Sequence, residues 1–262
     1  MVPVRFLRGM GRRRKFLLAG AGCAVVLAAL AWIERPRDEP ARATLSEAVR
    51  SFRAERGAGG GDGGAGEPAL GVYRYGTRGS ESIDSPVLDT THDYNGVSTI
   101  VVSDGRCAER ERWQVLSGRW TESEFCASGA KTTGAVTEFH QFFGVGEEDS
   151  FRCHSGVLAQ RRGARVSSDC ESDDSSISTT GRLVGFESLA VGGTTFETAH
   201  VESRSELGGA NRGTARRDEW RRRSDGLLVR RSVASEADSD RAGGTHYSER
   251  YTIRLLSTRP RR

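Results

Sequence analysis

The chain has 262 residues, enough for one or two domains, and its 39 basic residues include only two lysines, Lys15 and Lys131. A hydrophobic fraction of 36% and a mean hydropathy of −0.52 exclude a polytopic membrane protein, a collagen and a coiled coil. The net charge of +4 arises at the N-terminus, because residues 1–35 carry seven cations and one anion, which leaves 4 − 6 = −2 for the rest. Since the remaining charges mix both signs, we expect no nucleic-acid partner.

A basic segment, residues 1–15, precedes an uncharged apolar run at residues 16–33 (FLLAGAGCAVVLAALAWI). At about 1.5 Å per residue this run is about 27 Å long, enough to cross a bilayer as a helix. The positive-inside rule predicts a single-pass anchor in the cell membrane, with a cytoplasmic N-terminus and an extracytoplasmic remainder. Two alternatives stay open. The A-x-A stretch at 29–31 is compatible with a cleaved signal peptide, and Cys23 with a lipoprotein. Under each of these three interpretations, the domain that follows is exported.

Residues 34–67 form the expected stalk. Thr44 and Glu47 have the spacing of a capping box, and apolar residues recur from Leu45 to Phe52 as on one face of a helix. The sequence therefore predicts a helix from Thr44 to Arg56, resting on the domain or on the membrane. Residues 57–66 (GAGGGDGGAG) are typical of a flexible linker.

Residues 68–257 show the two-residue period of β-strands. At 246–256, Tyr247, Tyr251, Ile253 and Leu255 face one way and the polar residues between them the other. Similar runs occupy 71–77, 97–103, 111–116, 136–143, 181–189, 194–201 and 227–233, and turn dipeptides such as those at 104–105, 192–193 and 225–226 separate them. This pattern predicts a mainly β extracytoplasmic domain, an antiparallel meander forming a strongly curved sheet or half-open barrel. A basic tail, residues 258–262, ends the chain.

The four cysteines of this domain are an even number in an exported chain, which favours disulfide bonds. In a hairpin, the residue numbers of two directly paired residues add up to the same value for every pair. Cys107 and Cys126 share their sum with Trp113 and Trp120, and Cys153 and Cys170 share theirs with Val157 and Val166. We therefore predict the pairs Cys107–Cys126 and Cys153–Cys170, each across its own turn. No cysteine has C-x-x-C spacing, so we expect no metal site.

No catalytic signature is present, and we expect neither an enzyme nor a cofactor. The chain has no G-x-S-x-G elbow and no phosphate-binding loop. The densest polar cluster is THDYN at 91–95, which could hold an acid–base pair but is more typical of an Asx turn between strands. His140 alternates with apolar neighbours, as a histidine within a sheet does.

The last third of the domain resembles the LolA-like superfamily of periplasmic lipoprotein carriers and related envelope proteins. The matching positions are Gly193, Phe196, Trp220, Gly226, Leu227, Leu228 and Arg230. This resemblance implies a half-open β-barrel whose concave apolar face holds acyl chains.

The leading functional hypothesis is a non-catalytic, membrane-anchored extracytoplasmic protein that binds an apolar or lipidic ligand. The candidate lining residues are the aromatic and aliphatic strand positions Tyr73, Tyr75, Phe139, Phe143, Phe196, Trp220, Tyr251 and Ile253. The alternative is an envelope interaction or structural module with a filled core. An unrecognised hydrolase is a third hypothesis.

Overall fold

The computed structural model describes residues 40–56, 66–86, 89–127, 131–155, 161–239 and 244–262, which belong to one compact unit starting at Glu39. The basic N-terminal segment, the expected anchor at 16–33 and most of the glycine-rich linker lie outside these residues. Within them, no helix has both the length and the apolar character needed to cross a membrane. The elements are α2 (Leu45–Arg56), β1 (Gly71–Asp84), β2 (Asp89–Asp93), β3 (Gly96–Asp104), β4 (Glu109–Leu116), β5 (Arg119–Ala127), β6 (Lys131–Phe142), β7 (Val145–Ser155), β8 (Arg165–Glu171), β9 (Ser175–Val191), β10 (Thr194–Gly209), β11 (Asn211–Arg222), β12 (Leu228–Ser239) and β13 (Thr245–Leu255).

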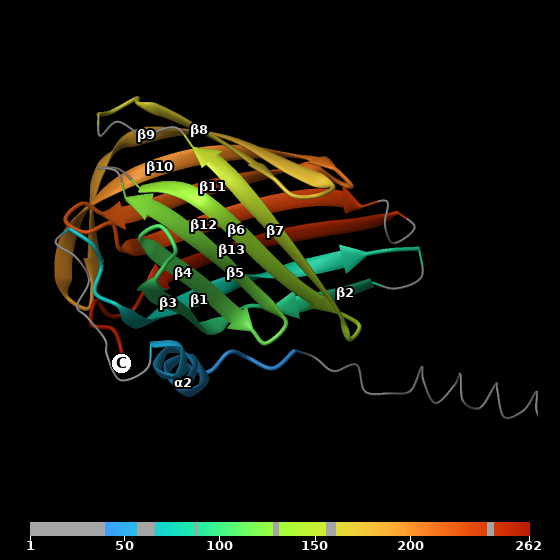
Figure 1. The fold of residues 1–262 in the computed structure, drawn as a ribbon. Coiled ribbons are helices and arrows are strands. Elements are labelled where there is room, and N and C mark those ends of the chain that lie inside the picture. The colour runs from blue at the N-terminus through green and yellow to red at the C-terminus, as the bar shows by residue number, and fades with distance from the viewer. Residues whose placement is uncertain (1–39, 57–65, 87–88, 128–130, 156–160, 240–243) are drawn as a thin grey trace, which may run out of the picture. The chain divides into compact units, whose positions relative to one another are not determined.

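The strands form one antiparallel sheet that closes on itself (Figure 1). From β3 to β13 each strand pairs with the next in sequence, which confirms the expected meander. β1 pairs with both β3 and β13, so a ring of 12 strands is complete. The expectation of a half-open barrel is therefore wrong. Pairs from Tyr75–Leu255 to Asp84–His246 join the first and last strands, and closure leaves no free edge at this seam.

Gly79 allows β1 to change partners along one edge. Residues 71–77 of β1 pair with β3, whereas residues 80–84 pair with the short strand β2. Between them, the Gly79 carbonyl accepts a hydrogen bond from the Tyr94 amide. Gly79 has φ +140°, and a Cβ atom there would lie 2.1 Å from the Arg250 carbonyl oxygen. Only glycine fits this corner without displacing β13.

The helix α2 begins and packs as the sequence predicts. The Glu47 amide donates to the Thr44 hydroxyl and the Thr44 amide to the Glu47 carboxylate, at 3.3 Å each, which completes the capping box. Ala48 and Phe52 are buried in the main apolar cluster of the domain, and α2 lies against β1 and β3. The tail also returns to the barrel, because Arg261 and Val72 exchange two backbone hydrogen bonds of 2.9 Å.

Both predicted disulfide bonds are present, Cys107–Cys126 and Cys153–Cys170. The β7–β8 register pairs Cys153 with Cys170 as expected; Val157, the other residue used for that register, lies outside the described residues. The β4–β5 register is wrong by one residue, since Trp113 pairs with Thr121 and Gln114 with Trp120. A shift of one residue turns side chains to the other face, so the two tryptophans lie on opposite faces of the sheet. The disulfide tolerates this shift because Cys107 precedes β4.

Candidate functional site

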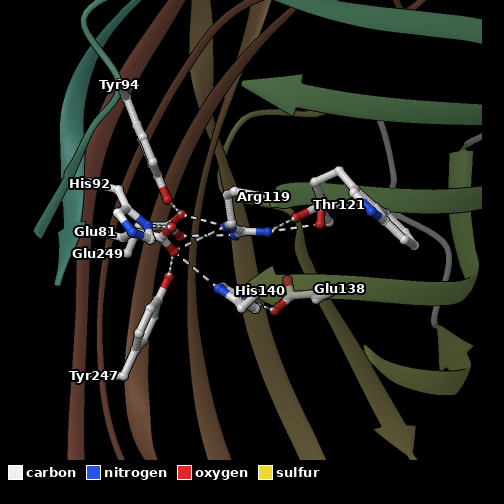
Figure 2. Close-up of polar contacts among 10 residues, drawn as sticks. Glu81, His92, Tyr94, Arg119, Thr121, Glu138, His140, Tyr247 and Glu249 are labelled. Atoms are coloured by element: carbon white, nitrogen blue, oxygen red, sulfur yellow. Dashed lines mark hydrogen bonds and ion pairs between the residues drawn. The ribbon is translucent and has the colours of Figure 1, made fainter. Parts of the chain in front are cut away.

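The inside of the barrel contains charged side chains. Strand alternation brings residues of β1, β5, β6 and β13, together with the segment around β2, to one place, shown in Figure 2. We call this set the buried polar cluster, although Glu138, His140 and Tyr247 are only partly buried: Glu81, His92, Tyr94, Arg119, Glu138, His140, Tyr247 and Glu249. β5 and β13 are not neighbours in the sheet, so contacts between them cross the interior.

The central pair is Arg119 with Glu249. The Arg119 Nε donates to Glu249 Oε1 at 2.9 Å and Nη2 to Oε2 at 3.1 Å, a bidentate arrangement. The Arg119 Nη1 donates to the Trp120 carbonyl and to the Thr121 hydroxyl. Tyr94 donates its hydroxyl proton to Glu249 Oε1 at 2.8 Å. Arg119 is 2% and Glu249 5% exposed, so this ion pair is held out of water by its own hydrogen bonds.

Glu81 lies beside this pair with no exposed surface. Its Oε1 is 2.9 Å from His92 Nδ1, and its Oε2 is 3.2 Å from His140 Nδ1 and 3.3 Å from the Tyr247 hydroxyl. The Arg119 Nε is 3.8 Å from the same Oε2. Oε1 therefore has one of these partners and Oε2 has three. Through these contacts Glu81 joins β1 to β2, β5, β6 and β13.

The electrostatics of the cluster favour its charged forms. Burial alone would raise the pKa of Glu81, but hydrogen bonds from His140 and His92 outweigh it and lower this pKa to about 2. Burial alone would lower the pKa of Arg119, yet the Glu249 carboxylate raises it well above its ordinary value. Burial and Arg119 lower the pKa of His140, but its contacts with Glu138 and Glu81 prevail and raise it. Charges of both signs are thus stable inside the barrel.

Aromatic rings surround the cluster. Trp113 stacks on Tyr251 with ring centroids 4.5 Å apart, and the Arg119 guanidinium lies 5.4 Å from the Trp113 ring. His92 stacks on Phe142 at 4.8 Å. These contacts fix the histidine and arginine side chains by packing, in addition to their hydrogen bonds.

A second group of ion pairs also spans the interior. Arg221 of β11 donates to both carboxylate oxygens of Glu111 in β4, at 2.7 and 3.0 Å. Its Nε donates to Glu219, which also accepts from Arg231 at 2.7 Å. β4 and β11 are not adjacent in the sheet, so this contact also crosses the interior. The two ion-pair groups thus brace opposite walls of the barrel against each other.

The structure divides the eight candidate lining residues into two sets. Tyr73, Tyr75, Tyr251 and Ile253 are each at most 5% exposed and belong to the main apolar cluster, where the Tyr75 hydroxyl donates to the Leu228 carbonyl. The other four lie in separate places. Phe139 stacks on Trp120, Phe143 is 39% exposed, Phe196 packs at the margin of the core beside Arg222, and Trp220 stacks on His200.

The buried polar cluster itself was not expected from the sequence. The THDYN segment does contain the Asx turn, since Asp93 accepts from the amide and the side chain of Asn95. Two residues of the same segment point into the barrel, where His92 contacts Glu81 and Tyr94 donates to Glu249. One signal was available: Glu249 occupies the same alternating face as Tyr247 and Tyr251, a charged residue on an inward face.

Two charged hollows occur on the barrel wall. One, of about 940 Å³, is lined mainly by acidic residues of β5, β7, β8 and the segment after β8, including Glu122, Glu124 and Glu171, together with Arg106 and Arg152. The other, of about 860 Å³, is lined by five arginines of β8 to β11, including Arg165, Arg182 and Arg204, together with Glu202 and Asp218. No family model, curated protein or solved structure matches the chain.

Proposed function

We propose that the chain is a membrane-anchored extracytoplasmic protein without catalytic activity, and that its barrel is an interaction or structural module with a filled core. The apolar run at 16–33 and its basic flank support the anchor, and two disulfide bonds are in keeping with an oxidising compartment. The barrel gives the module a rigid frame on which its outer surface is presented.

The observation that carries this proposal is the charged interior. A ligand-carrying barrel of this kind needs an apolar space for an acyl chain, yet here Arg119, Glu249 and Glu81 lie between the walls. An acyl chain entering there would separate charges that are already out of water, which costs several kcal/mol per uncompensated ion. Burying an acyl chain of about twelve methylenes would contribute roughly 10 kcal/mol before ordering costs. This gain is similar in size to the cost of separating the buried charges.

The outer surface favours interaction with charged partners. The acidic hollow and the arginine-rich hollow lie on different strands of the wall. Surfaces with an excess of one charge sign accelerate and orient association with partners of opposite charge.

The test uses the full-length protein, extracted gently from the membranes of its host. We expect the intact protein to remain membrane-bound, residues 36–262 to be protected from protease on the cytoplasmic side, and no stoichiometric lipid in native mass spectra. The apolar-ligand hypothesis would replace ours if a lipid co-purified and was lost from a folded Phe196→Asp variant. A soluble protein beginning near Trp32 would contradict the anchor.

A further inference from the structure

Three side chains with metal-binding atoms meet on one face of β10 and β11. The β10–β11 register pairs His200 with Trp220 and Glu202 with Asp218. Residues two apart on a strand share a face, as do directly paired residues. One ligand atom from each of His200, Glu202 and Asp218 lies within 4.8 Å of the others. None of the buried polar cluster takes part.

The His200 ring is held in a fixed position. Its Nδ1 lies 2.8 Å from Glu187 Oε1, and the Trp220 indole nitrogen donates to Glu187 Oε2 at 3.0 Å. The Trp220 ring stacks on the imidazole with centroids 4.2 Å apart. A carboxylate on one imidazole nitrogen, which orients the other nitrogen toward a cation, is the usual outer arrangement around metal-bound histidines.

The second imidazole nitrogen faces another carboxylate. His200 Nε2 lies 2.9 Å from Asp218 Oδ1. Both imidazole nitrogens of His200 therefore face carboxylate oxygens, at 2.8 Å for Glu187 and 2.9 Å for Asp218.

Glu202 supplies the third oxygen from the same face. Arg182 bonds to it through two nitrogens, at 2.8 and 3.0 Å, and both bonds go to Oε2. The side chains of Asp218 and Glu202 are 38% and 40% exposed, whereas that of His200 is 11% exposed. The cluster is thus anchored on its imidazole side and open to solvent on its carboxylate side.

We propose that His200 Nε2, Asp218 and Glu202 bind a divalent transition-metal cation of the Zn²⁺ class, with Glu187 and Trp220 as positioning residues. One imidazole and two carboxylates match the donor preference of Zn²⁺. Glu202 would offer Oε1, because both Arg182 bonds go to Oε2. Solvent completes the coordination on the open side. The site lies on the wall of the barrel, where Glu202 and Asp218 also line the arginine-rich hollow, and it does not depend on the filled core.

The test titrates the untagged, chelator-treated full-length protein with Zn²⁺ by calorimetry and with Co²⁺ by visible absorption. We expect one ion per chain. Asp218→Asn and Glu202→Gln should each weaken binding at least 10-fold, and Glu187→Gln about 10- to 100-fold. His246→Gln is the matched control, because His246 pairs with Asp238 at 2.8 Å and has no third ligand nearby among the described residues.

Melting curves without metal show whether each variant folds, and Glu202→Gln leaves both His200 contacts intact. Absence of binding by the wild-type protein would overturn the proposal and leave His200 as a side chain hydrogen-bonded between Glu187 and Asp218. Unchanged affinity in folded Asp218→Asn and Glu202→Gln variants, or loss of binding in His246→Gln, would overturn it as well.

Discussion

At the scale of single residues, Glu81 shows how a charge is kept inside an apolar wall. The carboxylate loses all contact with water, which opposes ionisation, and gains hydrogen bonds from two histidines and a tyrosine. The second effect prevails, and the pKa of Glu81 falls from 4.5 to about 2. The residue therefore links the stability of the fold to pH.

The first prediction concerns acid unfolding. Because the pKa of Glu81 is lower in the folded chain than in the unfolded one, its stabilising contribution is complete above about pH 4.5 and disappears as the pH falls toward about 2. A shift of this size corresponds to about 3 kcal/mol. Urea unfolding between pH 2 and 7 should show this loss, and Glu81→Gln should flatten it. An identical pH dependence in the variant would refute the assignment.

The second prediction concerns Arg119. Replacing it with methionine leaves Glu249 and Glu81 buried without their cation, which should lower the free energy of unfolding by about 3–5 kcal/mol at pH 7. Arg112→Met is the control, since Arg112 is 36% exposed and its carboxylate partner lies 3.9 Å away; it should cost less than about 1 kcal/mol. Equal losses in the two variants would show that the buried pair adds nothing.

Sequence patterns predict the orientation of some of these residues but not their contacts. The alternation around Tyr251 predicts which side chains of β13 face inward, and the structure confirms it. The same alternation includes Glu249, but its partner Arg119 is 130 residues away, and no local pattern identifies a counter-charge at that distance. For the same reason, His92 and His140 could be assigned to strands without any indication that both contact Glu81.

At the scale of elements, α2 was predictable because its signals are local. The capping box and the apolar face are contained in residues 44–52, and both act as expected. The β4–β5 register was not predictable in the same way, because the prediction matched two tryptophans as an apolar pair. Trp113 instead stacks on Tyr251 inside the barrel, whereas Trp120 stacks on Phe139. Hydrophobicity alone does not distinguish these two environments.

The third prediction concerns the docking of α2. Phe52 is 3% exposed and packs in the main apolar cluster, so Phe52→Ala should lower the free energy of unfolding by about 3–5 kcal/mol. Phe143, 39% exposed, offers the control, and Phe143→Ala should cost less than about 1 kcal/mol. Chemical denaturation of the two variants decides the matter. If Phe52→Ala cost no more than its control, α2 would not be an integral part of the folded domain.

At the scale of the whole molecule, closure was beyond the reach of the sequence. The meander follows from short turns, but the seam joins residues between 162 and 180 positions apart in the chain. Whether a curved sheet stays open or closes depends on the tilt and curvature of all its strands together. The glycine corner in β1 lies at this seam, and its φ cannot be read from the residue type.

The fourth prediction tests this seam. Gly79→Ala would place a methyl group 2.1 Å from the Arg250 carbonyl oxygen, in a conformation that alanine rarely adopts, and should cost more than about 2 kcal/mol or prevent folding. Gly185→Ala is the control, because its Cβ would meet nothing closer than 3.9 Å. Circular dichroism and urea unfolding compare the two. Matching transitions would mean that β1 and β13 can separate without loss of the fold.

The pairing of β1 with β13 also constrains the order of events during folding. A chain that emerges with its N-terminus first exposes the unpaired edge of β1 and an uncompensated Arg119 until residues 245–255 become available. Contacts this distant in sequence slow folding, because a long segment must be ordered before they form. The barrel should thus assemble late and as a unit, and a chain that stops before β13 should be a substrate for chaperones and proteases.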